Sequence, residues 1–437
     1  MSWLDFFQTT QPLKHTFGRG INAKIAKNEE ELFLKSSEAF ENREILQAYE
    51  LFFQSLINYS NETSNNNITF IRSEDELHFT IFQGSAKVTG KITKENLYAE
   101  AIIVKKSNAS VALKRYILER NYQLTYAYYF TNDENIKLKL YYDNITMSPQ
   151  KIFFPLREIA LNADFDKEHI KSEFRDIVLE DIYHVELLEE KEAKLKYDFL
   201  HQWIKEVEDK VLTLPSNDNA SMQAFVYLNL LFKIDYLLVP KYMIYQKLSK
   251  RILEYFSQEN SNIEAKNEEI KEYVQKLKKI SYEDFVQNFY NANYTFNPTE
   301  KSSDEDIVNF INESLNKVRW YKNNRYYQII PTIYNYISFY TLYNYGLNPV
   351  LRELFHLLVT VQNPSFFEKL EYKTLYDEKT KTFSKKNITA KIDTIINNYK
   401  TRYKELESFS EELNFSSLNE FSNSFFLQIQ NLNFEEV

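Results

Sequence analysis

Four residues that could perform acid–base or metal chemistry lie close together in the stretch "KIFFPLREIALNADFDKEHI", which spans residues 151–170. They are Asp164, Asp166, Glu168 and His169. On a helix that begins near residue 165, Asp166, His169 and Glu173 are spaced i, i+3 and i+7, so they share one face. Two carboxylates and an imidazole suit a metal ion if further ligands come from elsewhere. The spacing therefore allows a metal-dependent hydrolase with its site between two domains.

The same residues also suit the start of a helix. Asp164 stands where an N-cap accepts backbone N–H bonds, and Asp166 and Glu168 complement the positive end of the helix dipole. No HExxH or comparable metal pattern accompanies them. We therefore prefer helix-start chemistry at this junction between two helices, and we expect no catalytic residue, no metal and no cofactor.

The rest of the chain offers few groups for catalysis. It has no cysteine, which excludes disulfides, thiolate metal sites and cysteine nucleophiles. Its five glycines form no phosphate-cradling loop, and no serine lies in a G-x-S-x-G setting. We expect His78 on the solvent face of a strand, and His184 and His201 on a charged helix. The six histidines are scattered along the chain: His15, His78, His169, His184, His201 and His356.

Composition indicates an ordinary folded protein. The 437 residues are 43% hydrophobic and 26% charged, enough for two or three domains with their own cores. Acidic residues outnumber basic ones by 62 to 53, which argues against a nucleic-acid partner. The first residues lack a signal-peptide pattern, and no run of about 18 apolar residues could cross a membrane. We expect a cytoplasmic location and no membrane partner.

An aromatic run, "RYYQIIPTIYNYISFYTLYNYGL" at residues 325–347, could in principle stack bases or form a groove for a protein partner. Arg325 is its only basic residue, and its apolar positions follow helical spacing, so we expect a core helix. A second run, "ELLEEKEAKLK" at 186–196, is typical of a solvated helix face. Its leucines leave a coiled-coil homodimer open as an alternative.

The helices and strands that must position these residues can be predicted from the sequence pattern, which changes along the chain. A helix is predicted over 43–59, and a period of two follows from about residue 67 to residue 142. A short helix over 109–120, with Asn108 as its cap, interrupts the strands, and Ser148 with Pro149 begins another helix. The predicted strands are "ELHFTIFQG", "AKVTGKI", "NLYAEAIIVKK" and the hairpin "TYAYYF"–"IKLKLYY". This order predicts an α+β layer, an antiparallel sheet with helices on one face.

From about residue 165 onward the pattern predicts helices only. The first is a long charged helix over about 166–212, either continuous or with one break. Gly346 is the expected C-cap of the aromatic helix. The other predicted helices cover 220–239, 241–258, 262–280, a stretch capped by Ser303, 323–345, 349–361, 388–413 and a terminal segment.

Three stretches carry a resemblance to a known family: "FTIFQGSAKVTG" (79–90), "LKRYILERNYQLTYAYYF" (113–130) and "SPQKIFFPLREIALNADFDKEHIKSEF" (148–174). Together with the order of elements over 43–174, they resemble the bacterial YbjN-like domain, which has the fold of type III secretion chaperones. The positions that match its pattern are Ala160, Ala163, Asp164, Glu173 and Phe174. Pro155 departs from it, because a proline inside a helix should kink that helix.

The resemblance covers about the first 40% of the chain and implies protein binding without catalysis. We therefore expect an N-terminal arm at 1–42, a YbjN-like domain at 43–175 and an all-helical domain at 176–437. The function expected is a chaperone- or adaptor-like protein-interaction module with a protein partner of unknown identity. The alternatives are the metal-dependent hydrolase and a purely structural helical scaffold.

Overall fold

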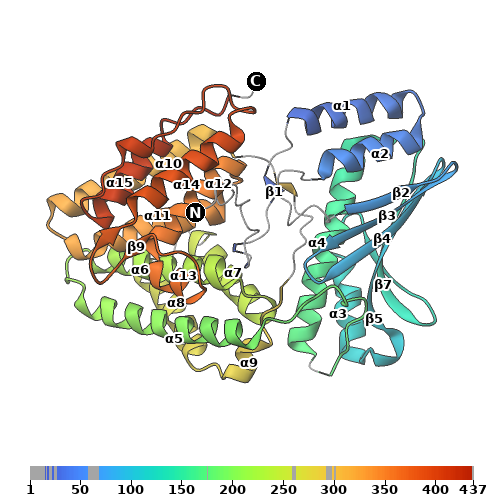
Figure 1. The fold of residues 1–437 in the computed structure, drawn as a ribbon. Helices are drawn as coiled ribbons and strands as arrows, with labels where there is room; N and C mark the ends of the chain where they lie inside the picture. The colour runs from blue at the N-terminus through green and yellow to red at the C-terminus, as the bar shows by residue number, and fades with distance from the viewer. Residues whose placement is uncertain are drawn as a thin grey trace, which may run out of the picture. The chain divides into compact units, whose positions relative to one another are not determined.

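The structure, a computed structural model, forms two compact units (Figure 1). Unit 1 comprises Met1–Leu187, Lys241–Met243 and Tyr290–Thr299, and unit 2 comprises the remainder. The residues described are 15, 17–18, 22–23, 27–57, 68–174, 176–257, 262–291, 298–299 and 302–435. Among them, no helix is long and apolar enough to cross a membrane.

Unit 1 is built on a six-stranded antiparallel sheet with the order β2-β3-β4-β5-β7-β6. Its strands are β2 (Ile68–Arg72), β3 (Glu76–Gln83), β4 (Ala86–Thr93), β5 (Asn96–Lys105), β6 (Tyr128–Thr131) and β7 (Asn135–Asp143). Alternate residues such as Leu77, Phe79 and Ile81 are buried, while His78 between them is exposed, as the alternating sequence predicts. The α+β prediction is therefore confirmed. A further short pair, β1 (Asn22–Ala23) and β8 (Pro298–Thr299), is parallel.

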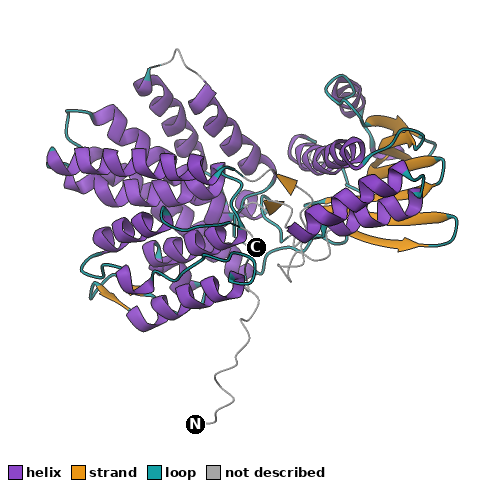
Figure 2. Cartoon of the chain, turned by 90° about the horizontal axis from the view of Figure 1, so that it is seen from above, coloured by secondary structure: helices purple, strands orange, loops and turns teal. Residues whose placement is uncertain are grey.

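Helices cover one face of this sheet (Figure 1). They are α1 (Lys27–Glu41), α2 (Ile45–Leu56) and α4 (Pro149–Glu173), while α3 (Val111–Arg120) packs beside β6. The core beneath them is aromatic, with the Phe53 ring 4.9 Å from Phe79 and 5.7 Å from Phe70. In the described part of unit 1, no helix packs on the opposite face of the sheet, which the view from above also shows (Figure 2).

Two N-terminal expectations need correction. The segment before residue 43 contains helix α1, which packs on α2, so the described part of this segment belongs to the folded unit and is not an arm. Residues 1–14 lie outside the described residues. The cap of α3 is Ser110, whose side chain accepts a hydrogen bond from the Leu113 N–H, and not Asn108. Asn108 instead ends a 3₁₀ turn, η2 (Lys106–Asn108).

The predicted junction between two helices at Asp164 is wrong. Helix α4 runs without interruption from Pro149 to Glu173, with Pro155 buried inside it. Pro149 occupies the first turn as predicted, although Ser148 makes no side-chain cap bond. The chain then leaves the helix at Phe174, and the next helix begins only at Glu190. The predicted charged helix over 166–212 is therefore broken at 174–189, and its first part belongs to α4. Tertiary packing of the buried face outweighs the local preference for a break at the proline and the acidic residues.

In the described part of unit 2, the regular structure is helical apart from a two-stranded hairpin, β9 (Tyr376–Asp377) with β10 (Thr382–Phe383), which the sequence did not predict. Its longer helices are α5 (Glu190–Thr213), α6 (Asn219–Lys233), α7 (Tyr242–Ser257), α8 (Ile263–Lys278), α10 (Asp304–Asn323), α11 (Ile330–Asn344), α12 (Pro349–Gln362), α14 (Lys385–Tyr399) and α15 (Leu418–Ile429). Shorter ones are η3 (Ile234–Leu238), α9 (Tyr282–Val286), η4 (Tyr327–Ile329), α13 (Pro364–Lys369) and η5 (Ser410–Glu412). The predicted helix over 388–413 therefore stops early, at Tyr399.

The aromatic run of unit 2 forms the core helix expected from its spacing. Tyr334 and Ile337 of α11 are buried, whereas Tyr327 lies in the preceding turn η4 and is exposed. The residue after the last turn of α11 is Tyr345 in an extended conformation, so Gly346 is not the cap that the sequence predicts.

We predict that Gly90→Ala destabilises the sheet by about 1–3 kcal/mol, because overpacking a buried site forces its neighbours to shift. A Cβ at Gly90 would lie 2.1 Å from the ring tip of Phe79 and 2.7 Å from the Tyr98 carbonyl oxygen. Hydrogen exchange of the β3 and β4 amides measures the effect. Thr80→Ala, on the other face of β3, is the control and should change the opening free energy much less; equal losses would contradict the prediction.

Candidate functional site

Asp166, the first of the predicted metal ligands, is a structural anchor inside unit 1. Its buried carboxylate accepts hydrogen bonds from the Tyr116 hydroxyl (2.6 Å), the Arg120 Nε (2.7 Å) and the Tyr129 hydroxyl (2.6 Å). Burial, followed by the charge of Asp166, raises the pKa of both tyrosines above the usual range. This carboxylate ties α4 to α3 and β6.

His169 and Glu173 do not join Asp166 in a metal site. The His169 ring stacks on Tyr116 at 4.6 Å and on Phe165 at 6.2 Å, and Glu173 is exposed at the end of α4. Within the described ranges, no group of three or more His, Asp or Glu side chains is arranged to hold a metal ion.

Asp164 caps a turn instead of a helix. Its carboxylate accepts hydrogen bonds from the Ser85 N–H (2.7 Å), the Ser85 hydroxyl (2.8 Å) and the Gln83 amide (3.2 Å) in the β3–β4 turn. Gly84 has a φ of +50°, and a Cβ on it would lie 2.2 Å from an Asp164 oxygen. The turn therefore needs glycine for both its conformation and the close approach of this carboxylate.

Lys167, which the sequence did not single out, is also buried. Its Nζ donates to the backbone oxygens of Glu180 (2.8 Å), Asp181 (3.2 Å) and Ser85 (3.3 Å). Burial lowers the pKa of this ammonium to about 8. It thereby holds residues 176–187, which we call the strap, against the end of the sheet, where the Glu180 N–H also donates to the Ile103 oxygen at 3.0 Å.

Glu168 completes the buried polar row of α4. It accepts hydrogen bonds from the Tyr290 hydroxyl (2.6 Å) and the Tyr242 N–H (3.1 Å), both in unit 1. Burial, with a further contribution from the Asp164 charge, raises the pKa of Glu168 to about 7. The acidic cluster of the sequence is therefore a set of anchors, each holding a different segment.

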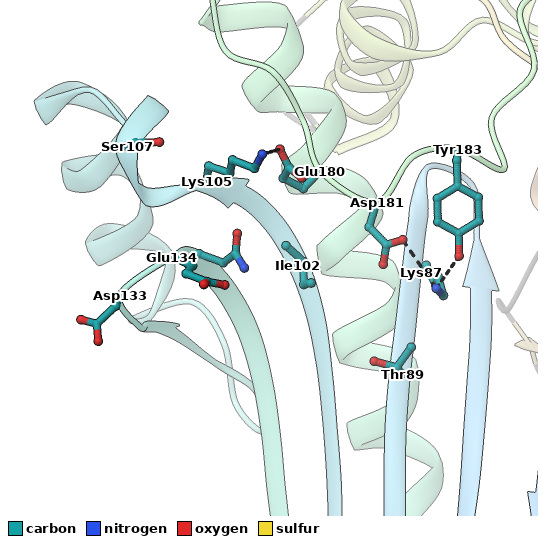
Figure 3. A pocket seen from close by; sticks show the side chains of 11 residues that line it. Lys87, Thr89, Ile102, Lys105, Ser107, Asp133, Glu134, Glu180, Asp181 and Tyr183 are labelled. Carbon is teal, nitrogen blue, oxygen red and sulfur yellow. Dashed lines mark hydrogen bonds and ion pairs between the residues drawn. The ribbon is translucent and has the colours of Figure 1, made fainter.

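The uncovered face of the sheet carries a pocket at the end where the strap crosses (Figure 3). The cavity measures about 870 Å³. Lys87 of β4 lies 3.6 Å from Asp181 and hydrogen-bonds to the Tyr183 hydroxyl, and Lys105 lies 3.9 Å from Glu180. The lining residues are Lys87, Thr89, Ile102, Lys105, Ser107, Asp133, Glu134, Asn135, Glu180, Asp181 and Tyr183.

Four carboxylates against two lysines make this pocket acidic. Burial lowers the pKa of Lys87, but Tyr183 and Asp181 more than offset it, so the net direction is upward and the ammonium stays charged. Thr89 and Ser107 supply hydroxyls, yet no lining residue is a histidine that could act as their base. The pocket therefore offers polar binding groups, and its hydroxyls have no histidine beside them among the lining residues.

A second feature of the uncovered face is a group of aromatic residues around one lysine, which we call the Tyr98 patch. Its members are Tyr98 of β5, Tyr128 and Phe130 of β6, and Lys139 and Tyr141 of β7. Strand register places Tyr98 opposite Tyr141, and Tyr128 opposite Lys139. Tyr128, Phe130 and Tyr141 are 45%, 41% and 55% exposed. These rings come from three neighbouring strands of this face.

Lys139 lies at the centre of the patch. Its Nζ is 4.0 Å from the ring centre of Phe130 and 5.1 Å from that of Tyr98. The neighbouring Glu100 is already engaged by Lys137 at 2.7 Å and by the Tyr98 hydroxyl. Burial raises the pKa of Glu100, but the hydrogen bonds from Lys137 and Tyr98 and the charges of Lys137 and Lys139 more than offset this, so its net direction is downward. No carboxylate of the described residues lies within ion-pair distance of Lys139 itself.

Sequence comparison does not supply a family for this arrangement. No known family model matches the chain, and no curated protein matches it at a significant level.

We predict that Asp166→Asn destabilises unit 1 by about 3–5 kcal/mol, because it leaves the buried Arg120 guanidinium without its counter-charge. Glu173→Gln, an exposed carboxylate on the same helix, should change stability by less than about 0.5 kcal/mol. Hydrogen exchange of the α4 amides measures the change in stability for both variants. Equal effects of the two substitutions would contradict the structural assignment of Asp166.

A second prediction concerns pH. Because the folded-state pKa of Glu168 is raised to about 7, unit 1 loses stability as pH rises from about 4.5 through 7 and Glu168 ionises. The stability difference between the wild type and Glu168→Gln should shift by about 3 kcal/mol across this window, in favour of the variant. Hydrogen exchange of the α4 amides, corrected for the intrinsic pH dependence of exchange, measures this difference in stability. A constant difference from pH 4 to 8 would refute the assignment.

Proposed function

We propose that this chain is a non-enzymatic protein-interaction module, chaperone- or adaptor-like, whose partner docks on the uncovered face of the sheet. The Tyr98 patch carries the proposal, since exposed aromatic groups on an uncovered face are typical of interaction sites. Tyrosine is also enriched among residues that dominate binding energy. The acidic pocket on the same face adds polar groups at the margin of the surface.

The fold supports this proposal through the resemblance in its sequence. We propose that unit 1 contains a YbjN-like domain, because its order of helix, strands, helix, hairpin and helix is the order that the resemblance implies. In secretion chaperones of this fold, sheets and helices hold partner segments. We place the module in the cytoplasm.

A photo-crosslinking experiment in cells tests the proposal. A benzophenone amino acid at Tyr128, in the full chain, should form adducts with a partner protein that mass spectrometry identifies reproducibly. The matched control is Tyr122, which is 93% exposed but lies outside the patch, in the turn after α3. Adducts at neither position, or equal adducts at both, would contradict docking on this face.

A further inference from the structure

We infer that the Tyr98 patch recognises an extended acidic segment of a partner protein, in which a carboxylate residue is flanked by aromatic residues. This inference rests on the proposed function and adds the chemistry of the partner. It follows from the charge of the patch, the positions of its rings and the composition of the surrounding face.

The charge of the patch calls for an anion. Every other lysine in this part of the face has a carboxylate partner: Lys137 pairs with Glu100, and Lys91 pairs with Glu76. Lys139 has no carboxylate within ion-pair distance among the described residues, since Glu100 opposite it is hydrogen-bonded to Lys137 and Tyr98, and its ammonium lies against two rings. A carboxylate that binds there forms a charge-assisted hydrogen bond beside apolar groups, where such a bond is stronger than in bulk water.

The rings on both sides of Lys139 indicate what should flank that carboxylate. Tyr98 and Phe130 lie on the strands on either side of β7, and their ring centres lie 5.1 Å and 4.0 Å from the Lys139 Nζ. In an extended peptide, side chains on one face recur every two residues, at about 6–7 Å. A segment of the pattern aromatic-x-acid-x-aromatic therefore brings its rings over the patch while its carboxylate meets Lys139.

The face as a whole favours an acidic peptide over a single-stranded nucleic acid. A nucleic acid needs a continuous row of unpaired basic residues along its backbone. Here Lys139 alone is unpaired among the lysines on this part of the face, Glu100 lies directly opposite it in the strand register, and the whole chain carries a net charge of −9. One ammonium is sufficient for one carboxylate.

Fluorescence anisotropy with the full chain tests the inference. The probe is a fluorescein-labelled Gly/Ser peptide in which a glutamate is flanked two residues away on each side by phenylalanine. The control peptide is identical except that lysine replaces the glutamate. We expect the glutamate peptide to bind at least about tenfold more tightly than the lysine peptide, equivalent to about 1.4 kcal/mol. Binding should weaken with added salt.

Variants of Lys139 and Lys91 distinguish binding at the Tyr98 patch from a general effect of surface charge. Lys139→Gln should weaken binding of the glutamate peptide about tenfold, and Lys139→Glu should reverse the preference toward the lysine peptide. Lys91→Gln is the control, because Lys91 is paired with Glu76 on the same face, and it should leave binding within about twofold. Circular dichroism confirms that all three variants are folded.

Three outcomes would overturn the inference. They are equal binding of the two peptides, an unchanged affinity in Lys139→Gln, and tighter Lys139-dependent binding of a labelled oligothymidylate than of the glutamate peptide. If any of these occurs while Tyr128 still crosslinks to a protein in cells, the proposed function stands and only the partner chemistry is wrong. If peptide binding follows the expected pattern but no crosslink forms at Tyr128, the docking proposal fails instead.

Discussion

The buried charges of α4 are the constraint on which unit 1 depends. Asp166, Lys167 and Glu168 are buried at three consecutive positions, and the half-buried Asp164 precedes them by two residues. Each of the four requires a partner from a different segment of the chain. An uncompensated buried charge costs several kcal/mol, so the β3–β4 turn, α3, the strap and Tyr290 must all be in place together. The anchors thereby make the assembly of the unit cooperative and set the face on which α4 lies.

This arrangement also decides where a function can reside. Because α1, α2 and α4 occupy one face of the sheet, the other face remains available, and its two distinctive features differ in charge. The pocket beside the strap is acidic, whereas the Tyr98 patch presents the unpaired ammonium of Lys139 among aromatic rings. A partner that spans both features would meet opposite charges at the two places, which would orient it on the sheet.

The sequence predicted much of the fold and little of the site. Alternation in "ELHFTIFQG" and "IKLKLYY" located strands correctly, because period-two burial is a local signal. The hairpin prediction also paired β6 with β7, but the sequence pattern could not reveal that β5 lies on the other side of β7, so that Tyr98, Lys139 and Phe130 meet. Their contact depends on strand order, which no local pattern encodes.

The acidic cluster shows the same division between local and tertiary information. By itself, the sequence determined the composition, the α+β order of elements and the absence of cysteine chemistry, since these depend on residue types and short spacings. Only the tertiary structure decided that Asp164 caps a turn, that α4 continues through Pro155, and that Asp166 binds Arg120 instead of a metal ligand set. The physical reason is that a charged side chain is neutralised by whichever group the fold brings within hydrogen-bond distance. For Asp164 and Asp166, Ser85 and Arg120 come from 79 and 46 positions away in the sequence.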